Sequence, residues 1–166
     1  MKLACALLIL LLPFTASAFD HSHGKWGEAL KKYQDSSGLM KYKQLKSDLK
    51  KSPEHSLGIY LKAIQAVPLT EYNKWNDNQK KAYLINEYNA LTVKLITDNY
   101  PVKSIKKIGG WFTKPWSIEF FSLLGGQIQS LDPIEHEWLR PNFKDYRIHA
   151  AVNCASISCP PLRSEA

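Results

Sequence analysis

Two cysteines near the end of the chain have a spacing that could support chemistry. Cys154 and Cys159 lie five residues apart in the run NCASISCPP, residues 153–161. A loop that folds back would bring their Cα atoms to roughly 4.4–6.8 Å, the range found in disulfides. The spacing is longer than that of a Cys-x-x-Cys redox motif. One interpretation is therefore a structural disulfide, Cys154–Cys159, that locks the loop.

A second interpretation is a thiol hydrolase or transferase that acts on a peptide, amide or ester in the cell envelope. Cys154 would be the nucleophile, and a histidine oriented by a carboxylate or amide would be its base. Along an extended strand, His149 would lie about 16 Å from Cys154. His136, on the preceding predicted helix, is therefore the better base. Its neighbour Glu135 would be a helix cap or a second polar group, because adjacent helical residues do not face each other.

Other polar residues could position a substrate or an oxyanion in such a site: Asn86, Asn89, Arg140 and Ser156. The two asparagines lie three residues apart in a predicted helix and share one of its faces. Asparagine is an indifferent helix former, so the pair calls for a reason. Either both amides face solvent, or they hydrogen-bond a neighbouring loop or line a polar pocket.

A third interpretation is a tetrahedral zinc site with two nitrogen and two sulfur ligands. Its ligands would be His136, His149, Cys154 and Cys159. Their spacing matches no familiar zinc pattern, in which paired ligands lie about two to four residues apart. A disulfide and a thiolate nucleophile exclude each other in one molecule. We therefore expect no metal and no other cofactor, and either a Cys/His enzyme or a non-catalytic binding module.

The length of 166 residues predicts about one domain. The composition is that of a globular protein, with 45% hydrophobic and 22% charged residues. Basic residues outnumber acidic ones by 22 to 15, and lysines crowd one short stretch at positions 41, 43, 46, 50 and 51. These lysines form either a solvated helix face or a patch for an anionic envelope polymer or lipid headgroups.

The first 18 residues predict a cleaved signal peptide. Lys2 is followed by the apolar run 3–12, and Ala16-Ser17-Ala18 is a small-residue cleavage site. A run of about ten apolar residues is too short to cross a bilayer. We expect a periplasmic or secreted protein without a transmembrane segment after cleavage, and no nucleic acid partner. Cleavage removes Cys5 and leaves one cysteine pair in an oxidising compartment.

Apolar periodicity predicts a helix-rich N-terminal half. The longest helix is expected over residues 77–99, with Asn76 or Asp77 as its N-cap and its end before Pro101. His21 and His23 lie in a polar lead-in that we expect to be unstructured. We expect residues 19–70 to form an N-terminal helical segment of the same domain as residues 71–166.

The second half predicts a small sheet. Gly125-Gly126 is typical of a two-residue hairpin between residues 118–124 and 127–131. Asp132 predicts the N-cap of a short helix, with Glu135 completing a capping box. Alternation of apolar and polar residues over 147–152 predicts a strand that enters the cysteine loop. The predicted fold class is therefore α+β.

Several segments resemble the domain-of-unknown-function 547 family, found in bacterial exported proteins and in some plant proteins. The similar segments are KAYLINEYNAL at 81–91, YPV at 100–102, SLDPIEH at 130–136, RIHAA at 147–151 and CASISCPPL at 154–162. Leu84 stands where the family more often has tryptophan, which changes packing rather than chemistry. The resemblance covers the chain from about Trp75 to its end, and the family's biochemical activity is not established.

The resemblance also implies that the family-like region, residues 71–166, is cut short, because the family domain continues for some tens of residues beyond the cysteine motif. An incomplete sheet would leave an unpaired strand edge exposed to solvent. We therefore expect poor solubility for the chain as it stands.

Overall fold

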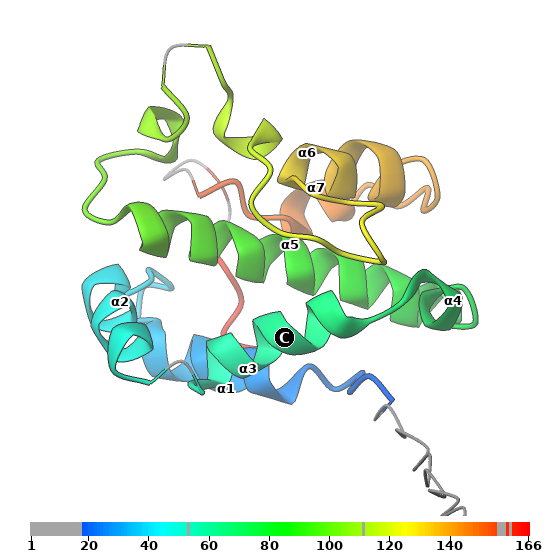
Figure 1. Ribbon diagram of the computed structural model, residues 1–166, viewed down its shortest axis with the longest axis horizontal. Coiled ribbons are helices and arrows are strands. Elements are labelled where there is room, and N and C mark those ends of the chain that lie inside the picture. Colours follow the sequence, from blue (N-terminus) through cyan, green and yellow to red (C-terminus); the bar gives the residue numbers. More distant parts are fainter. Residues whose placement is uncertain (1–17, 53, 111, 156–158, 160) are drawn as a thin grey trace, which may run out of the picture.

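The computed structural model describes residues 18–52, 54–110, 112–155, 159 and 161–166. About 54% of these described residues are helical. The helices pack around one long central helix, α5 (Asp77–Asn99), with elements on two opposite sides of it (Figure 1). No described helix is both long enough and apolar enough to cross a bilayer.

Local sequence signals define both ends of α5. Asn76 Oδ1 accepts a hydrogen bond of 3.0 Å from the Gln79 backbone N–H, and Gln79 Oε1 accepts one of 3.0 Å from the Asn76 N–H. This reciprocal pair is a capping box, which satisfies two N–H groups that a helix start leaves free. The helix stops before Pro101, which cannot continue it. The predicted bounds of this helix are confirmed.

The N-terminal helices form the layer on one side of α5. They are α1 (Gly24–Tyr33), α2 (Tyr42–Lys51) and α3 (Ser56–Ala66), with the short α4 (Leu69–Tyr72) near the start of α5 (Figure 1). The apolar stripe of α1 is fully buried, with Trp26, Leu30 and Tyr33 each at most 1% exposed. The predicted helix-rich first half is confirmed.

Shorter elements cover the other side of α5. They are η1 (Ile105–Lys107), η2 (Pro115–Ser117), α6 (Leu131–Pro133), the π-helix η3 (Ile134–Leu139) and α7 (Ile148–Ala151). The C-terminal segment 161–166 then crosses α5 and returns to the side of α1 (Figure 1). There Gln34 Nε2 donates a hydrogen bond of 3.0 Å to the Leu162 carbonyl.

The predicted α+β fold is wrong, because the described residues contain no sheet. In place of the hairpin, one isolated bridge joins Leu123 and Ile128. The turn between them has positive φ angles at Leu124, Gly125 and Gly126. Pairing stops there because the flanking chain soon joins helical elements, η2 on one side and α6 on the other. Without a sheet, the expected exposed sheet edge does not exist among these residues.

The predicted strand over 147–152 is also wrong, because this segment forms helix α7. Asp145 starts the turn: its Oδ1 accepts from the Arg147 N–H at 3.1 Å, and its carbonyl accepts from the Ile148 N–H at 3.2 Å. Ile148 and Val152 are both buried, at 3% and 5% exposure. Residues four apart lie on one face of a helix, and they also lie on one face of a strand. The apolar pattern of this short segment therefore fitted both structures.

Two smaller expectations are corrected as well. The helix expected to start at Asp132 begins at Leu131 after Ser130, and Asp132 Oδ2 instead accepts a 2.6 Å hydrogen bond from the Ser117 hydroxyl. Glu135 therefore belongs to no capping box. His23, expected in an unstructured lead-in, is only 3% exposed, and its Nδ1 lies 2.8 Å from the Tyr60 hydroxyl oxygen.

Glu87 on α5 is a carboxyl group inside the core. Its exposed fraction is 0%, and neither carboxyl oxygen has a hydrogen-bond partner among the described residues. The Tyr83 hydroxyl, one turn earlier, donates to the Ile64 carbonyl at 2.8 Å instead. Burial raises the pKa of Glu87 well above its usual 4.5, because a charge without hydrogen bonds is costly in the core. Folding therefore favours the neutral, protonated form of Glu87.

This assignment predicts a stability that falls as pH rises. Above pH 4.5 the unfolded chain releases the Glu87 proton while the folded chain keeps it, so folding requires proton uptake. Up to the raised pKa, the free energy of unfolding should fall by about 1.4 kcal/mol per pH unit from this group. Glu87→Gln should remove that slope, as measured by urea unfolding between pH 5 and pH 8.

The exposed Glu137→Gln variant is the control and should keep the pH dependence of the natural chain. The difference between the natural chain and Glu87→Gln isolates this one carboxyl from all other titrating groups. Parallel pH profiles for these two proteins would show that Glu87 is ionised in the folded state.

Candidate functional site

The cysteine loop leaves the end of α7 and is closed by a disulfide between Cys154 and Cys159. Their Cα atoms are 6.4 Å apart, within the usual range for a disulfide. The disulfide interpretation of the sequence is confirmed by this bond. Ser156, which we expected to position a substrate, lies outside the described residues.

Asn89 of α5 holds the start of the cysteine loop. Its Nδ2 donates to the Ala151 carbonyl at 2.9 Å, and its Oδ1 accepts from the Asn153 N–H at 2.8 Å. One amide thus satisfies a carbonyl at the end of α7 and the N–H that begins the loop. The side chain is only 7% exposed, so these bonds are largely shielded from water. The expectation that an asparagine of this helix hydrogen-bonds a neighbouring loop is confirmed.

Asn86 lies one turn before Asn89 and is 8% exposed. Both asparagines line a small pocket of about 260 Å³, together with Ala151, Asn153 and Leu162. The C-terminal segment forms the opposite wall of this pocket. A role of Asn86 and Asn89 in substrate binding stays a prediction.

Glu135, Arg140 and His149 come together at the surface between η3 and α7. Glu135 Oε1 accepts hydrogen bonds from Arg140 Nη2 at 2.6 Å and from Arg140 Nε at 3.1 Å. Arg140 Nη2 also lies 3.0 Å from His149 Nδ1. A guanidinium can only donate, so Nδ1 accepts this bond and the proton of the neutral ring resides on Nε2. In this arrangement Arg140 separates the carboxylate from the imidazole.

This geometry differs from that of a nucleophile with its base. A histidine that acts as the base points one ring nitrogen toward the nucleophile, and a carboxylate hydrogen-bonds its other ring nitrogen. Here a cation contacts His149, and the Cys154 sulfur is bonded to another sulfur. His136 is exposed on η3, and no hydrogen bond joins it to the cysteine loop within the described residues.

The four ligands of the zinc interpretation are not assembled. The two sulfurs are bonded to each other, and His149 contacts Arg140. Among the residues that the structure describes, no three histidine, cysteine, aspartate or glutamate side chains gather as metal ligands would.

A groove of about 470 Å³ runs beside the cysteine loop. Most of the described side chains that line it are apolar or aromatic, and Lys103 is the one charged residue among them. The described lining residues are Ser37, Gly38, Leu39, Met40, Tyr42, Ile96, Tyr100, Val102, Lys103, Ser104, Ile105, Asn153, Ala155, Cys159, Pro161 and Leu162. Tyr42 and Tyr100 are stacked, with ring centroids 6.5 Å apart. Burial raises the pKa of Tyr42 to about 12, so its hydroxyl stays neutral at physiological pH.

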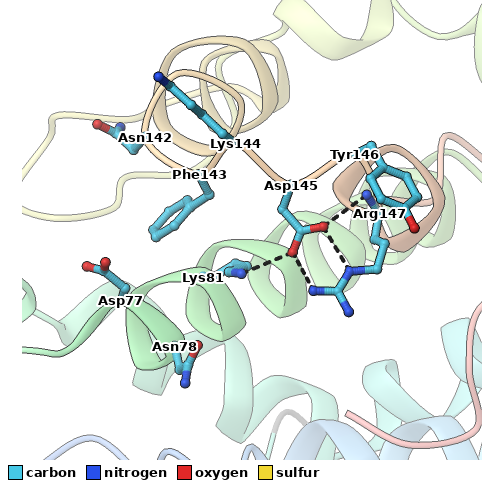
Figure 2. A pocket seen from close by; sticks show the side chains of 9 residues that line it. All are labelled: Asp77, Asn78, Lys81, Asn142, Phe143, Lys144, Asp145, Tyr146 and Arg147. Atoms are coloured by element: carbon cyan, nitrogen blue, oxygen red, sulfur yellow. Dashed lines mark hydrogen bonds and ion pairs between the residues drawn. The ribbon is translucent and has the colours of Figure 1, made fainter.

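A second hollow, of about 590 Å³, is polar and lies near the start of α5. Figure 2 shows Asp145 between Lys81 of α5 and Arg147 at the start of α7. The Asp145 carboxylate accepts from Lys81 Nζ at 3.2 Å and from Arg147 Nε at 2.9 Å. These cations hold the pKa of Asp145 well below its usual range. This carboxylate is fully engaged, so its evident role is to fasten the segment before α7 to α5.

Sequence reasoning missed two parts of this region. Asn153 Oδ1 accepts from the Ala155 N–H at 2.7 Å, an Asx turn that supports the positive φ of Ala155. An asparagine directly before the cysteine was a signal for such a turn. The pairing of Tyr42 with Tyr100 had no signal, because the two residues are far apart in the sequence and meet only through the packing of α2 on α5.

Comparison with known proteins agrees with the resemblance seen in the motifs. A family model described as "Protein of unknown function, DUF547" matches residues 72–166, more than half of the chain. No curated protein and no solved structure matches the chain.

The role of Asn89 as an anchor can be measured directly. Asn89→Ala removes the two hydrogen bonds that the amide makes to the Ala151 carbonyl and the Asn153 N–H. The free energy of unfolding should fall by about 2–4 kcal/mol, because an unsatisfied buried group costs about 1–3 kcal/mol. Urea unfolding of the oxidised protein would measure the loss.

Asn86→Ala is the matched control, since it changes the same residue type on the same helix at similar burial. Its effect should be clearly smaller, because the Asn86 amide is not part of the bridge. Equal losses for the two variants would contradict the anchoring role.

Proposed function

Since the chain belongs to the DUF547 family, we propose that it is an exported binding module whose disulfide-locked loop forms one wall of a peptide-binding groove. The Cys154–Cys159 bond is the observation that carries this proposal. It removes the thiolate that an enzyme would need, and it fixes a loop that borders the 470 Å³ groove. Pockets that bind small molecules have volumes of about 300–1,000 Å³.

The lining of the groove favours an apolar peptide segment that carries a carboxylate. Leu39, 61% exposed, and the half-buried Val102 offer apolar contact area at the surface. Lys103 supplies a positive charge for a carboxylate of the peptide. The neutral Tyr42 hydroxyl can donate to a peptide carbonyl. The net charge of +7 further favours an acidic partner.

The disulfide and Asn89 would act together in this function. Both fix the loop before any ligand arrives, so less conformational entropy is lost on binding. This function would also explain why the buried Asn89 amide hydrogen-bonds the backbone of the loop.

The lysines in and beside α2 support an anionic polymer as the ligand less strongly than the groove supports a peptide. Lys46 Nζ donates to the Asp98 carbonyl at 3.0 Å and to the Tyr100 carbonyl, so it caps the end of α5. Lys41, Lys43, Lys50 and Lys51 are exposed and spread over nearly three helical turns, about 2.8. Exposed lysines of this kind are typical of a solvated face.

A Cys/His hydrolase or transferase is the second candidate function. It is favoured by the meeting of Glu135, Arg140 and His149 near the end of α7. This function requires that the disulfide be reduced, that Cys154 become a thiolate and that His149 or His136 turn toward it. The two candidates therefore differ in the number of free thiols in the active protein.

Peptide binding predicts a specific effect of Leu39→Asp. The substitution removes an apolar contact and places a negative charge at the groove, which repels an acidic peptide. Against short synthetic peptides that combine apolar and acidic residues, affinity should fall about tenfold or more, which corresponds to about 1.4 kcal/mol. Isothermal titration calorimetry on the best binder of the set would measure it.

Phe112→Asp is the matched control, because Phe112 is 100% exposed and does not line the groove. It introduces the same charge elsewhere on the surface and should leave the affinity unchanged. If no peptide of the set binds the natural chain, or both variants lose affinity alike, the groove is not the binding site.

A thiol count decides between the two candidate functions. The exported protein, unfolded with a chelator but no reductant and then alkylated, should take up no label and should weigh two hydrogens less than the reduced chain. The double variant Cys154→Ser/Cys159→Ser should lose about 2 kcal/mol of stability from the opened loop, and it should bind the peptide more weakly. Two labels per chain, together with hydrolase activity that disappears in Cys154→Ser, would instead establish the thiol enzyme.

A further inference from the structure

Residues 19–23 lie in an aromatic cluster at the start of the described chain. The ring of Phe19 packs against Trp75, with centroids 5.4 Å apart, and edge-on against Tyr83 at 5.3 Å. The His21 ring contacts Trp75 at 4.5 Å. A segment that begins the helical domain is thus held by packing rather than left in solvent.

A polar contact accompanies this packing. The backbone N–H of Phe19 donates a 3.1 Å hydrogen bond to Oε1 of Glu71, in the short helix α4. Ala18, the preceding residue, is exposed. The nitrogen that joins these two residues is therefore fixed beside a carboxylate at the surface of the cluster.

This nitrogen belongs to the bond that the sequence marks for processing. The small-residue motif Ala16-Ser17-Ala18 predicts cleavage between Ala18 and Phe19. Hydrolysis of that amide consumes one water molecule. It leaves a carboxylate on Ala18 and a new amine on Phe19, which is protonated in part at neutral pH and fully when a carboxylate stabilises its charge.

We propose that signal-peptide cleavage after Ala18 creates an α-ammonium group that pairs with the Glu71 carboxylate, so that the processed N-terminus docks in a preformed site. The inference rests on the predicted signal peptide and is independent of the groove. The Phe19 nitrogen already lies 3.1 Å from Glu71 Oε1. Cleavage would replace its neutral N–H donor by a charged ammonium donor, and the backbone would not need to move. Charge-assisted hydrogen bonds are roughly twice as strong as neutral ones.

The surroundings of the new charge support this pairing. Asp20 adds a second carboxylate on the same segment. Burial lowers the pKa of His23 to about 4, so its ring is uncharged at neutral pH and does not repel an ammonium group. His21 Nδ1 and His23 Nε2 are buried and have no hydrogen-bond partner among the described residues, so the cluster has unused hydrogen-bonding capacity there. From α5, the ring of Tyr83 packs against Phe19, and burial raises the pKa of Glu87 well above its usual range.

The first experiment locates the cleavage. The full chain, expressed with its own first 18 residues in a bacterial host that exports it, should yield a protein that starts at Phe19 in N-terminal sequencing and in intact mass. A different first residue, or a retained leader, would overturn the proposal.

The second experiment measures the ion pair by a double-mutant cycle. One version of the protein begins at Phe19. The version compared with it begins with an initiator methionine followed by Ala18 and Phe19, so that the Phe19 nitrogen is an uncharged amide. The protein that begins at Phe19 should melt about 2–4 °C higher, the shift that an ion pair of modest strength gives a domain of this size. Glu71→Gln should abolish the difference between the two.

Acetylation of the Phe19 amine provides a matched chemical control. It keeps an N–H donor at the same position, removes the charge, and should lower the melting temperature to that of the extended chain. Equal melting temperatures for the free and the acetylated N-terminus would overturn the proposal. A difference that survives Glu71→Gln would assign the charge to another partner and would overturn it equally.

Discussion

The burial of α5 on nearly all its sides is the constraint on which the rest of the structure depends. Thirteen of its residues are buried, too many for one amphipathic stripe, so other segments must cover the helix around its whole circumference. α1, α2 and α3 cover one side, and the elements after Pro101 cover the other (Figure 1). Each polar group on such a helix must find a partner inside the protein or lose its charge. Asn89 takes the first course and Glu87 the second.

The same constraint ties the candidate site to the core. The cysteine loop follows α7, which is a single turn of helix. Asn89 connects the loop to the most buried element, and the Leu162 carbonyl connects the following segment to Gln34 of the first layer. The groove between α2, residues 100–105 and the loop is thus bounded by parts of the chain that all rest on α5. A rigid support of this kind suits a recognition surface.

The sequence predicted those parts whose signals are local and long. α5 carries a capping box, a terminal proline and more than six turns of periodic pattern, so both ends were predicted. Residues 147–152 offered only six positions, over which alternation and i, i+4 spacing coincide at Ile148 and Val152. The disulfide was one of three interpretations that the two cysteines allowed, whereas the contact of Arg140 with His149 was not predicted. That contact depends on where α7 meets η3 in space.

The π-helix η3 has a consequence for how this region tolerates changes in length. Its wide turn lets Arg140 N–H bond to the Glu135 carbonyl five residues earlier, and it stacks the two side chains in the same direction. In an α-helix, positions five apart differ by about 140° around the axis, so this pair would separate. Loss of a single residue within 136–139 would leave Glu135 and Arg140 four positions apart, about 40° around an α-helix, so the pair would survive conversion of the turn to α-helical geometry. At the natural spacing of five residues, the π turn is thus the feature that brings Glu135 and Arg140 together.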